Sequence, residues 1–221
     1  MNRWLVRPDR ALLGGFLVFA FSAWAFVEIA DEVAEGEALG ADRYVLGFFT
    51  AHSGWPDWIV HAVVDLTALG GMALLTLITL LCALYLGAAR RLSSAFWLVL
   101  AVVGGLALSH GLKLLFQRPR PDIIEHIVAV STTSFPSGHA ANSAVVYLTL
   151  AVIIAREQRS RQLRIYVIAV GILLTMLVGS TRLVLGVHWP SDVLAGWALG
   201  AGWAALCASV SRLMSPGRRL A

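Results

Sequence analysis

The stretch TRLVLGVHWPSD, residues 181–192, lies between two long apolar runs. It contains a cation, Arg182, a histidine, His188, and a carboxylate, Asp192, which follows the histidine by four residues. Ionisable groups at the edge of a membrane span are costly and usually have a functional or pairing role. A carboxylate at this spacing can hold one ring nitrogen of the histidine while the other nitrogen reacts. The stretch therefore predicts a polar site at the end of a membrane span.

The composition around this stretch is that of an integral membrane protein. The 221 residues are 58% hydrophobic and 14% charged, and the mean hydropathy is +0.77, outside the usual balance of soluble domains. The net charge of +4 comes from short clusters. No long basic run alternates with aromatic residues, so we expect no nucleic-acid partner. The two cysteines, Cys82 and Cys207, lie in apolar runs and are expected to pack there.

Six apolar segments are long enough to cross a bilayer as helices, so the predicted fold class is all-α. The predicted spans are residues 11–27, 59–86, 95–115, 137–155, 165–184 and 190–213. We expect the first span to be uncleaved, because its apolar run is longer than a signal-peptide core. The acidic stretch 28–42 is predicted to be a loop that leads into an interfacial helix near residues 44–49. No repeat or linker divides the sequence, so we expect a single integral membrane domain, residues 1–221, with its core at 95–213.

The distribution of basic residues predicts the orientation of the chain in the membrane. Six spans put both termini on one side, and cytoplasmic segments carry an excess of Lys and Arg. Of the 17 Lys and Arg, all but those at positions 43, 113, 118, 120 and 182 fall on the side of the termini. We therefore expect cytoplasmic termini and an extracytoplasmic site.

Three polar clusters come to the outward side in this topology. Lys113 and Arg120 follow the third span, the sequence PSGH at 136–139 opens the fourth, and the stretch 181–192 joins the fifth to the sixth. Cations beside a hydroxyl and the amides of a helix N-terminus form a site for a dense anion such as phosphate. The residues expected to bind the phosphate are Lys113, Arg120, Ser137, Gly138 and Arg182.

These clusters resemble the signature motifs of the type-2 phosphatidic acid phosphatase superfamily of membrane lipid phosphatases. The motifs are Lys113-x6-Arg120-Pro121, Pro136-Ser137-Gly138-His139 and Thr181-Arg182-x5-His188-x3-Asp192. The third motif commonly opens with Ser-Arg, and Thr181 keeps the hydroxyl at that place. The six-span layout is similar to the bacterial phosphatidylglycerophosphatase B and undecaprenyl-diphosphate phosphatase branch, which implies a location in the bacterial inner membrane.

The resemblance also implies a role for each site residue. His188 is the expected nucleophile, which becomes a phosphohistidine, and Asp192 holds its other ring nitrogen. His139 is expected to protonate the leaving group and then to help activate water. The scheme needs no metal or other cofactor, and the sequence shows no cluster of spare Asp, Glu and His ligands. The implied partners are a lipid phosphate and the bilayer, with no obligate protein partner.

The sequence therefore predicts metal-independent hydrolysis of a lipid phosphate or diphosphate at the extracytoplasmic face. One alternative is a transferase that passes the phosphoryl or headgroup to an acceptor other than water, since a phosphohistidine can be intercepted. A second alternative is a carrier that binds a lipid phosphate without turnover. Binding alone needs only the cations, so the presence of His139, His188 and Asp192 together favours catalysis.

Several other polar residues lie near these motifs or repeat their spacing. Arg118 is expected to contact a lipid headgroup or solvent, and His110 either supports Lys113 or packs within its helix. His61 and Asp65 repeat the His-x3-Asp spacing without cations, so a buried polar pair is expected there. The loop at 122–135 is expected to contribute to headgroup selection and lipid access.

Overall fold

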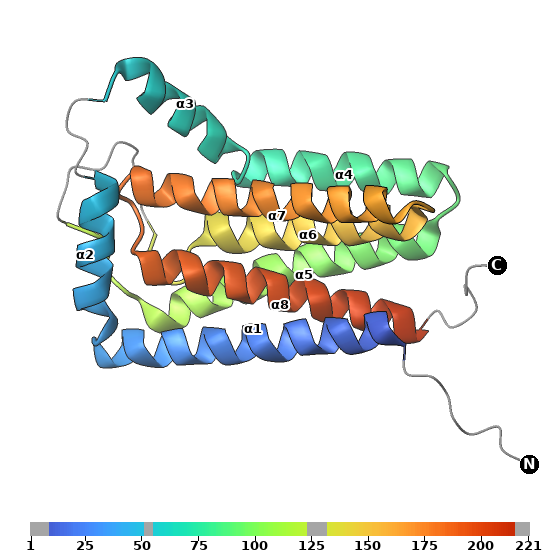
Figure 1. Ribbon diagram of the computed structural model, residues 1–221, viewed down its shortest axis with the longest axis horizontal. Helices are drawn as coiled ribbons and strands as arrows, with labels where there is room; N and C mark the ends of the chain where they lie inside the picture. Colours follow the sequence, from blue (N-terminus) through green and yellow to red (C-terminus); the bar gives the residue numbers. More distant parts are fainter. Residues whose placement is uncertain (1–8, 51–54, 123–131, 215–221) are drawn as a thin grey trace, which may run out of the picture.

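The computed structural model of the protein is a bundle of long helices (Figure 1). The structure describes residues 9–50, 55–122 and 132–214. The elements in chain order are α1 (Arg10–Glu35), α2 (Ala38–Thr50), α3 (Asp57–Ala68), α4 (Met72–Ala88), α5 (Leu92–Phe116), α6 (Gly138–Glu157), α7 (Arg161–Val184) and α8 (Pro190–Met214). The described residues contain no strand, and the prediction of an all-α membrane protein is confirmed.

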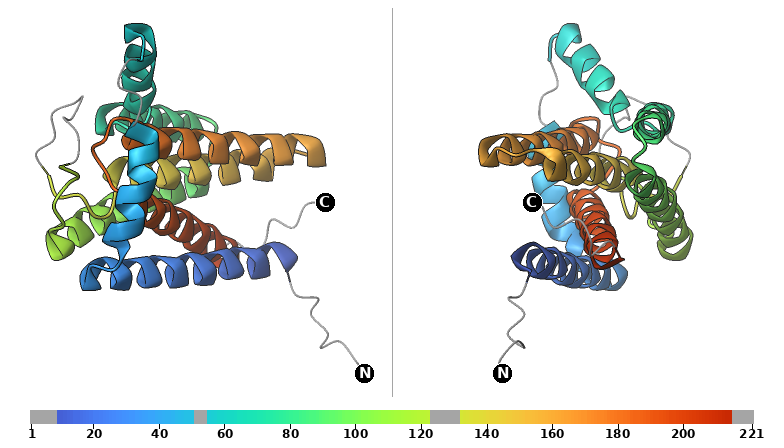
Figure 2. Two further views of the ribbon diagram at one scale, coloured as in Figure 1. Left: turned by 60° about the vertical axis from the view of Figure 1, so that its left-hand side comes forward. Right: turned by 90° about the vertical axis from the view of Figure 1, so that its right-hand side faces the viewer.

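The predicted second span is broken in the structure. Within the part of the chain that the structure describes, five helices, α1 and α5 to α8, are each long and apolar enough to cross a membrane, and α3 with α4 forms a sixth candidate only as a bent pair. The bend is 46° and falls at Leu69-Gly70-Gly71, where two adjacent glycines disfavour a continuous helix. As a result α3 leans away from the bundle, whereas α4 runs along it (Figure 2).

The acidic stretch that follows the first span is mostly helical, so the prediction of a loop over 28–42 is wrong. α1 continues to Glu35 and ends at Gly36, which has a left-handed φ of 81°. The apolar residues Phe26, Ile29 and Val33 keep a helical spacing through this stretch and pack against a buried cluster that includes Phe135. The acidic residues occupy the exposed face of the same turns. The predicted interfacial helix lies within α2.

Close contact between α6 and α8 brings the second and third motifs together. A Cβ atom added at Gly196 would lie 2.7 Å from the Ser137 carbonyl oxygen, and one at Gly200 would lie 2.5 Å from that of Ala141. These two positions therefore require glycine, and small residues at this spacing allow helix backbones to approach closely in membranes. The Ser137 amide donates to the Asp192 carbonyl oxygen at 2.9 Å. The first turns of α6 and α8 consequently lie side by side.

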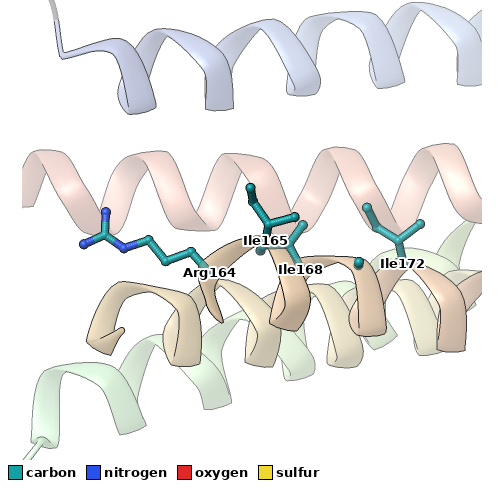
Figure 3. A pocket seen from close by; sticks show the side chains of 5 residues that line it. Arg164, Ile165, Ile168 and Ile172 are labelled. Carbon is teal, nitrogen blue, oxygen red and sulfur yellow. The ribbon is translucent and has the colours of Figure 1, made fainter. Parts of the chain in front are cut away.

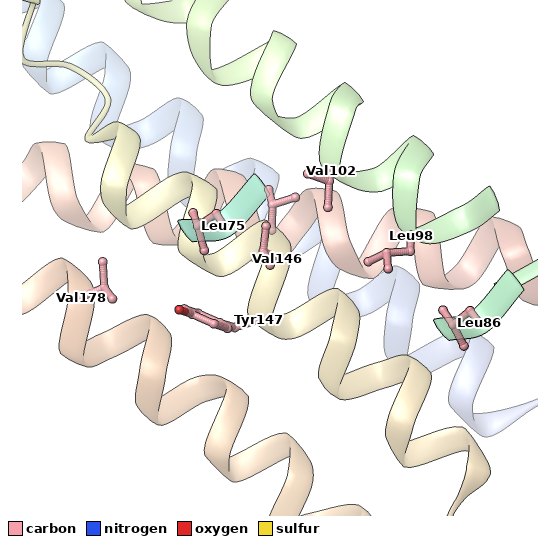
Figure 4. Close-up of a cluster of buried hydrophobic side chains, with 8 residues drawn as sticks. Leu75, Leu86, Leu98, Val102, Val146, Tyr147 and Val178 are labelled. Carbon is pink, nitrogen blue, oxygen red and sulfur yellow. The ribbon is translucent and has the colours of Figure 1, made fainter. Parts of the chain in front are cut away.

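A cluster of buried side chains joins four helices in the bundle interior (Figure 4). It contains Leu75 and Leu86 of α4, Leu98 and Val102 of α5, Val145, Val146 and Tyr147 of α6, and Val178 of α7. The Tyr147 hydroxyl donates to the Leu69 carbonyl oxygen at 2.7 Å. This bond satisfies a backbone group that the helix break leaves free, so the core also holds the break in place.

The two ends of the bundle differ in what they carry. α1 begins and α8 ends at the same end (Figure 1), where Asp9 pairs with Arg212 and Arg91 pairs with Glu157 at 2.7 Å. At the opposite end α2 lies across the bundle, and its Leu46 is buried against Trp189 and Val193. The end of α5 and the start of α6 also lie there. All three sequence motifs therefore reach the end that α2 covers.

Candidate active site

His188 lies in the short connection between α7 and α8 and is 2% exposed. Its Nδ1 atom is 3.4 Å from Oδ2 of Asp192, which lies in the first turn of α8. The same oxygen accepts the Trp189 amide at 2.9 Å. Since this carboxylate also receives a backbone amide near the helix start, its position is fixed by the fold of the connection. Asp192 and His188 thus form the pair that the sequence predicts.

The Asp192 carboxylate is fully buried and has several donors. Oδ1 accepts Nη1 of Arg118 at 2.7 Å, and Oδ2 also accepts the hydroxyl of Ser134. Hydrogen bonds and a cation at this distance favour the charged form of a carboxylate. The group beside Nδ1 of His188 is therefore an ionised acceptor.

Arg120 lies against the other ring nitrogen of His188. Its Nη1 atom is 3.2 Å from His188 Nε2 and donates to the Val187 carbonyl oxygen at 2.6 Å. Its Nε and Nη2 atoms donate to the carbonyl and hydroxyl oxygens of Thr132 at 2.7 and 3.1 Å. The hydrogen-bond network therefore assigns the proton of the neutral imidazole to Nδ1 and leaves a lone pair on Nε2.

The surroundings of His188 keep its ring neutral. Burial, together with the positive charges of Arg120 and Lys113, lowers the pKa of His188 to about 4, although Asp192 acts in the opposite direction. Burial also lowers the pKa of the Arg120 guanidinium, an effect that Asp192 partly offsets. At neutral pH the site therefore combines an uncharged imidazole with an adjacent cation. That is the state a nucleophilic histidine needs.

The remaining cations reach the same place from α5 and α7. Lys113 Nζ donates to the Thr133 carbonyl oxygen at 2.8 Å, and its Cε atom would lie 3.3 Å from a Cβ added at Gly138. Arg182 is 4% exposed, and its Nη1 atom donates to the Thr67 hydroxyl at 2.9 Å. Both cations are therefore held by the protein next to the start of α6.

Two buried polar atoms in the motifs have no hydrogen-bond partner. They are Oγ of Ser137 and Nε of Arg182, and only two other buried side-chain atoms of the described residues share this state. An unsatisfied buried polar group costs about 1–3 kcal/mol, so such groups call for an explanation. Each of these two atoms is therefore available to bind a ligand oxygen or another polar group.

His139 lies in the first turn of α6, half-buried, within electrostatic range of Arg182 and His188. The break between α3 and α4 packs against its ring: a Cβ added at Gly70 would lie 3.2 Å from His139 Cδ2 and 2.3 Å from Val178 Cγ1. Gly70 therefore leaves the space that the ring occupies. With His139, all eight site residues predicted from the sequence lie at one end of the bundle.

The structure also shows site contacts that the sequence motifs do not include. Residues 132–134 run beside the motifs and contact Arg120, Lys113 and Asp192 in turn. Arg118 is 10% exposed and binds two carboxylates, so the alternative of a solvent-exposed charge is wrong, and the headgroup contact stays a prediction. The cluster of hydroxyls directly before the second motif is the one sequence signal that points to the segment 132–134.

Four further polar side chains that the sequence singles out lie outside the centre of the site. The Thr181 hydroxyl donates to the Val178 carbonyl oxygen of its own helix at 2.6 Å. His61 and Asp65 are exposed, because α3 leans away from the bundle, so the expected buried pair does not form. His110 is exposed on α5. The expected headgroup and lipid contacts of residues 123–131 lie outside the described residues.

An apolar groove lies along the first half of α7 (Figure 3), away from the motif residue Arg182 in the last turn of that helix. Its lining residues are Arg164, Ile165, Ile168, Ala169 and Ile172. Ile165 and Ile172 are exposed hydrophobic residues in a candidate span, as expected of a lipid-facing surface. Within residues 9–50, 55–122 and 132–214, no three His, Cys, Asp or Glu side chains are grouped as metal ligands.

Comparisons with known proteins agree on the region that carries the motifs. A family model described as the PAP2 superfamily matches residues 94–213. Phosphatidylglycerophosphatase B of Bacillus subtilis (strain 168) is 35% identical over 151 residues, which cover 65% of this chain and 70% of that protein. Decaprenylphosphoryl-5-phosphoribose phosphatase of Mycobacterium tuberculosis is 31% identical over 137 residues, which cover 52% of this chain and 71% of that protein.

A solved structure has the same fold. The crystal structure of a transmembrane PAP2 type phosphatidylglycerolphosphate phosphatase from Bacillus subtilis matches with a TM-score of 0.82 and 24% identity. The match covers 92% of this chain and 98% of that chain. The arrangement of nearly the whole chain is therefore one that an experimental structure also contains.

Proposed function

The chain belongs to the PAP2 superfamily and is a membrane lipid phosphatase, and we propose that it cleaves its substrate through a phosphohistidine formed on His188. One observation carries the proposal. The buried His188 ring has Asp192 at Nδ1 and Arg120 at Nε2, so one nitrogen is oriented and the other faces a cation of the kind that a phosphate needs. A carrier has no need for this arrangement.

In the first step, the substrate phosphate displaces the resting contact between Arg120 and Nε2. Lys113, Arg120 and Arg182, with the Ser137 hydroxyl and the Gly138 amide, then bind the non-reacting oxygens and balance their charge. Nε2 forms a bond to phosphorus as the bond from phosphorus to the lipid oxygen breaks. His139 takes up a proton when the negatively charged phosphate binds beside it and donates that proton to the leaving oxygen, and Asp192 stabilises the positive charge that develops on the His188 ring.

In the second step, water attacks phosphorus and the bond to Nε2 breaks. His139, which lost its proton in the first step, accepts one from the water. Inorganic phosphate leaves, and His188 returns to its neutral form with the proton on Nδ1. The same cations act in both steps, since both pass through a transferring phosphoryl group.

We infer that the substrate is a lipid phosphate or diphosphate whose tail remains in the bilayer. The two relatives compared above are named for substrates of this type. The polar site lies at the end of a bundle whose long helices are apolar enough to span a membrane, so a phosphate at the membrane surface is within its reach. All such lipids would make the same phosphate contacts. The choice among them must therefore come from contacts of the tail and headgroup outside the phosphate site.

Phosphate release in the presence of EDTA tests this function. The purified protein in detergent is offered phosphatidylglycerol phosphate, undecaprenyl diphosphate and phosphatidate, and released phosphate is measured with and without the chelator. We expect unchanged release from at least one lipid, because the cations that hold the phosphate are side chains. Loss of activity that Mg²⁺ restores would contradict the metal-independent scheme. Tight binding of a lipid phosphate without release would instead support the transferase or the carrier.

We further propose that the site faces the extracytoplasmic side. The basic residues near the turns between α4 and α5 and between α6 and α7 lie at the other end of the bundle, as the pairing of Arg91 with Glu157 illustrates. In a variant without Cys82 and Cys207, a cysteine at the exposed Ser160 should resist an impermeant thiol reagent in intact cells. A cysteine at the exposed Glu37, next to α2, should react. The reverse pattern would overturn this orientation.

A further inference from the structure

Helix α2 carries a carboxylate that is buried beside the candidate active site. Asp42 is 3% exposed although its helix lies across the end of the bundle. Its Oδ2 atom accepts Nη2 of Arg118 and the Ser191 hydroxyl, both at 2.6 Å, and its Oδ1 atom accepts the Ser191 amide at 2.8 Å. Every described contact of this carboxylate is thus with residues next to Asp192 or bonded to it.

The other arm of Arg118 reaches the catalytic pair. Nη1 donates to Oδ1 of Asp192 and to the Ser191 hydroxyl, both at 2.7 Å. The guanidinium carbon also lies 5.6 Å from the centre of the Trp189 ring. The planar guanidinium therefore bridges the carboxylates of Asp42 and Asp192, and its orientation is fixed from three sides.

This bridge fixes the orientation of the Asp192 carboxylate beside His188. Arg118 occupies Oδ1, whereas Oδ2 receives His188 Nδ1 together with Ser134 and Trp189. Rotation of the carboxylate would break the bond to Arg118. The proton on Nδ1 of His188 therefore depends indirectly on the position of Arg118, and through it on Asp42.

From these contacts we propose that Asp42 and Arg118 are positioning residues for the histidine nucleophile. This inference rests on the proposed function of His188. Asp42 holds Arg118, and Arg118 holds the Asp192 carboxylate in the orientation that accepts the His188 proton. Asp42 also offsets the charge of Arg118, so Asp192 keeps enough negative charge to stabilise the ring as it is phosphorylated. Helix α2 is thereby part of the catalytic apparatus.

Asp42→Asn tests the proposal with a side chain of the same shape. In the variant, the charge of Arg118 is offset by Asp192 alone. We therefore expect kcat to fall by about 10- to 100-fold, the usual effect of losing a partner that orients a functional histidine. KM should stay within about threefold, because Asp42 does not touch the substrate phosphate. The matched control is Glu37→Gln, which neutralises an exposed carboxylate next to the start of α2 and should leave both constants unchanged.

A second pair of variants distinguishes positioning from simple anchoring of α2. Arg118→Met leaves Asp42 and Asp192 buried near each other without their shared cation, and two such carboxylates cannot both stay ionised easily. We expect this variant to lose more activity than Asp42→Asn. Asp42→Asn combined with Arg118→Met removes the competing charge, so the double variant should be several-fold more active than Arg118→Met alone. If the two residues only anchored α2, the activity losses of the two single variants would add in the double variant.

Wild-type protein and His188→Ala are measured in parallel, so a failure of the proposed function is seen separately as absent phosphate release in the wild type. With an active wild type, normal kcat in Asp42→Asn would overturn the inference. An Asp42→Asn protein that no longer elutes as a folded species in detergent would also overturn it, since the carboxylate would then serve the fold. Additive losses in the double variant would count against it equally.

Discussion

Replacing His188 by alanine is expected to lower kcat by on the order of ten-thousandfold or more, because the variant lacks the only group proposed to attack phosphorus. The ring is nearly fully buried and its Nε2 atom faces Arg120. In the variant, no other group is therefore positioned to attack phosphorus in its place. The measurement is single-turnover phosphate release by purified protein in detergent. The matched control is His110→Ala, which removes an exposed histidine from α5 and should retain full activity.

Binding of the lipid phosphate should survive the loss of His188. Lys113, Arg120 and Arg182 remain, and the resting contact between Arg120 and Nε2 no longer has to be displaced. Equilibrium binding of a lipid phosphate to His188→Ala is therefore expected to be as tight as in the wild type or tighter. A variant that turns over within about tenfold of the wild type would show that His188 is not the nucleophile.

Replacing His139 by alanine should produce the second largest effect, and its size should depend on the leaving group. With an ordinary lipid alcohol, loss of the proton donor is expected to lower the rate by about 100- to 10,000-fold. A nitrophenyl phosphate ester has a leaving group that needs no proton, so phosphorylation of His188 should be much less affected. Hydrolysis of the phosphohistidine still lacks its base, and the phosphorylated protein should accumulate.

The control for His139 is His61→Ala, because His61 is exposed on α3, outside the site. Accumulation is followed by intact-protein mass after acid-free quenching. Equal slowing of the lipid and nitrophenyl substrates, with no phosphorylated protein, would contradict the role of His139 in both proton transfers. It would point to a role in the shape of the site, where the ring packs beside Gly70.

The site could be predicted from the sequence where its parts are local. His188 and Asp192 are four residues apart, so a helix that begins directly after His188 places the two side chains next to each other. The cations and Ser137 lie at the ends of predicted spans. The number of spans between them therefore predicts that they lie on the same side of the membrane. Asp42 could not be found in this way. Its partner Arg118 is 76 residues away, and only the position of α2 across the bundle brings them together.

The two errors in the predicted fold also arise from contacts between segments that are distant in the sequence. The acidic residues after the first span suggested a loop, but an exposed helical face accommodates them while Ile29 and Val33 continue the apolar face. The second span was predicted to be continuous because its composition is apolar throughout. Its break depends on Gly70, whose backbone packs against His139 and Val178 of other helices. Composition detects burial in a membrane, but contacts between helices decide where a span bends.

The most direct test of a histidine nucleophile is to trap the phosphorylated protein. Wild-type protein is mixed with a lipid carrying ³²P in its phosphate and quenched within one turnover, and label on the protein is tested for stability in acid and alkali. We predict label that is stable in alkali and lost in acid, that maps to His188, and that is absent from His188→Ala. Turnover without labelled protein in both the wild type and His139→Ala, or label on another residue, would contradict the account.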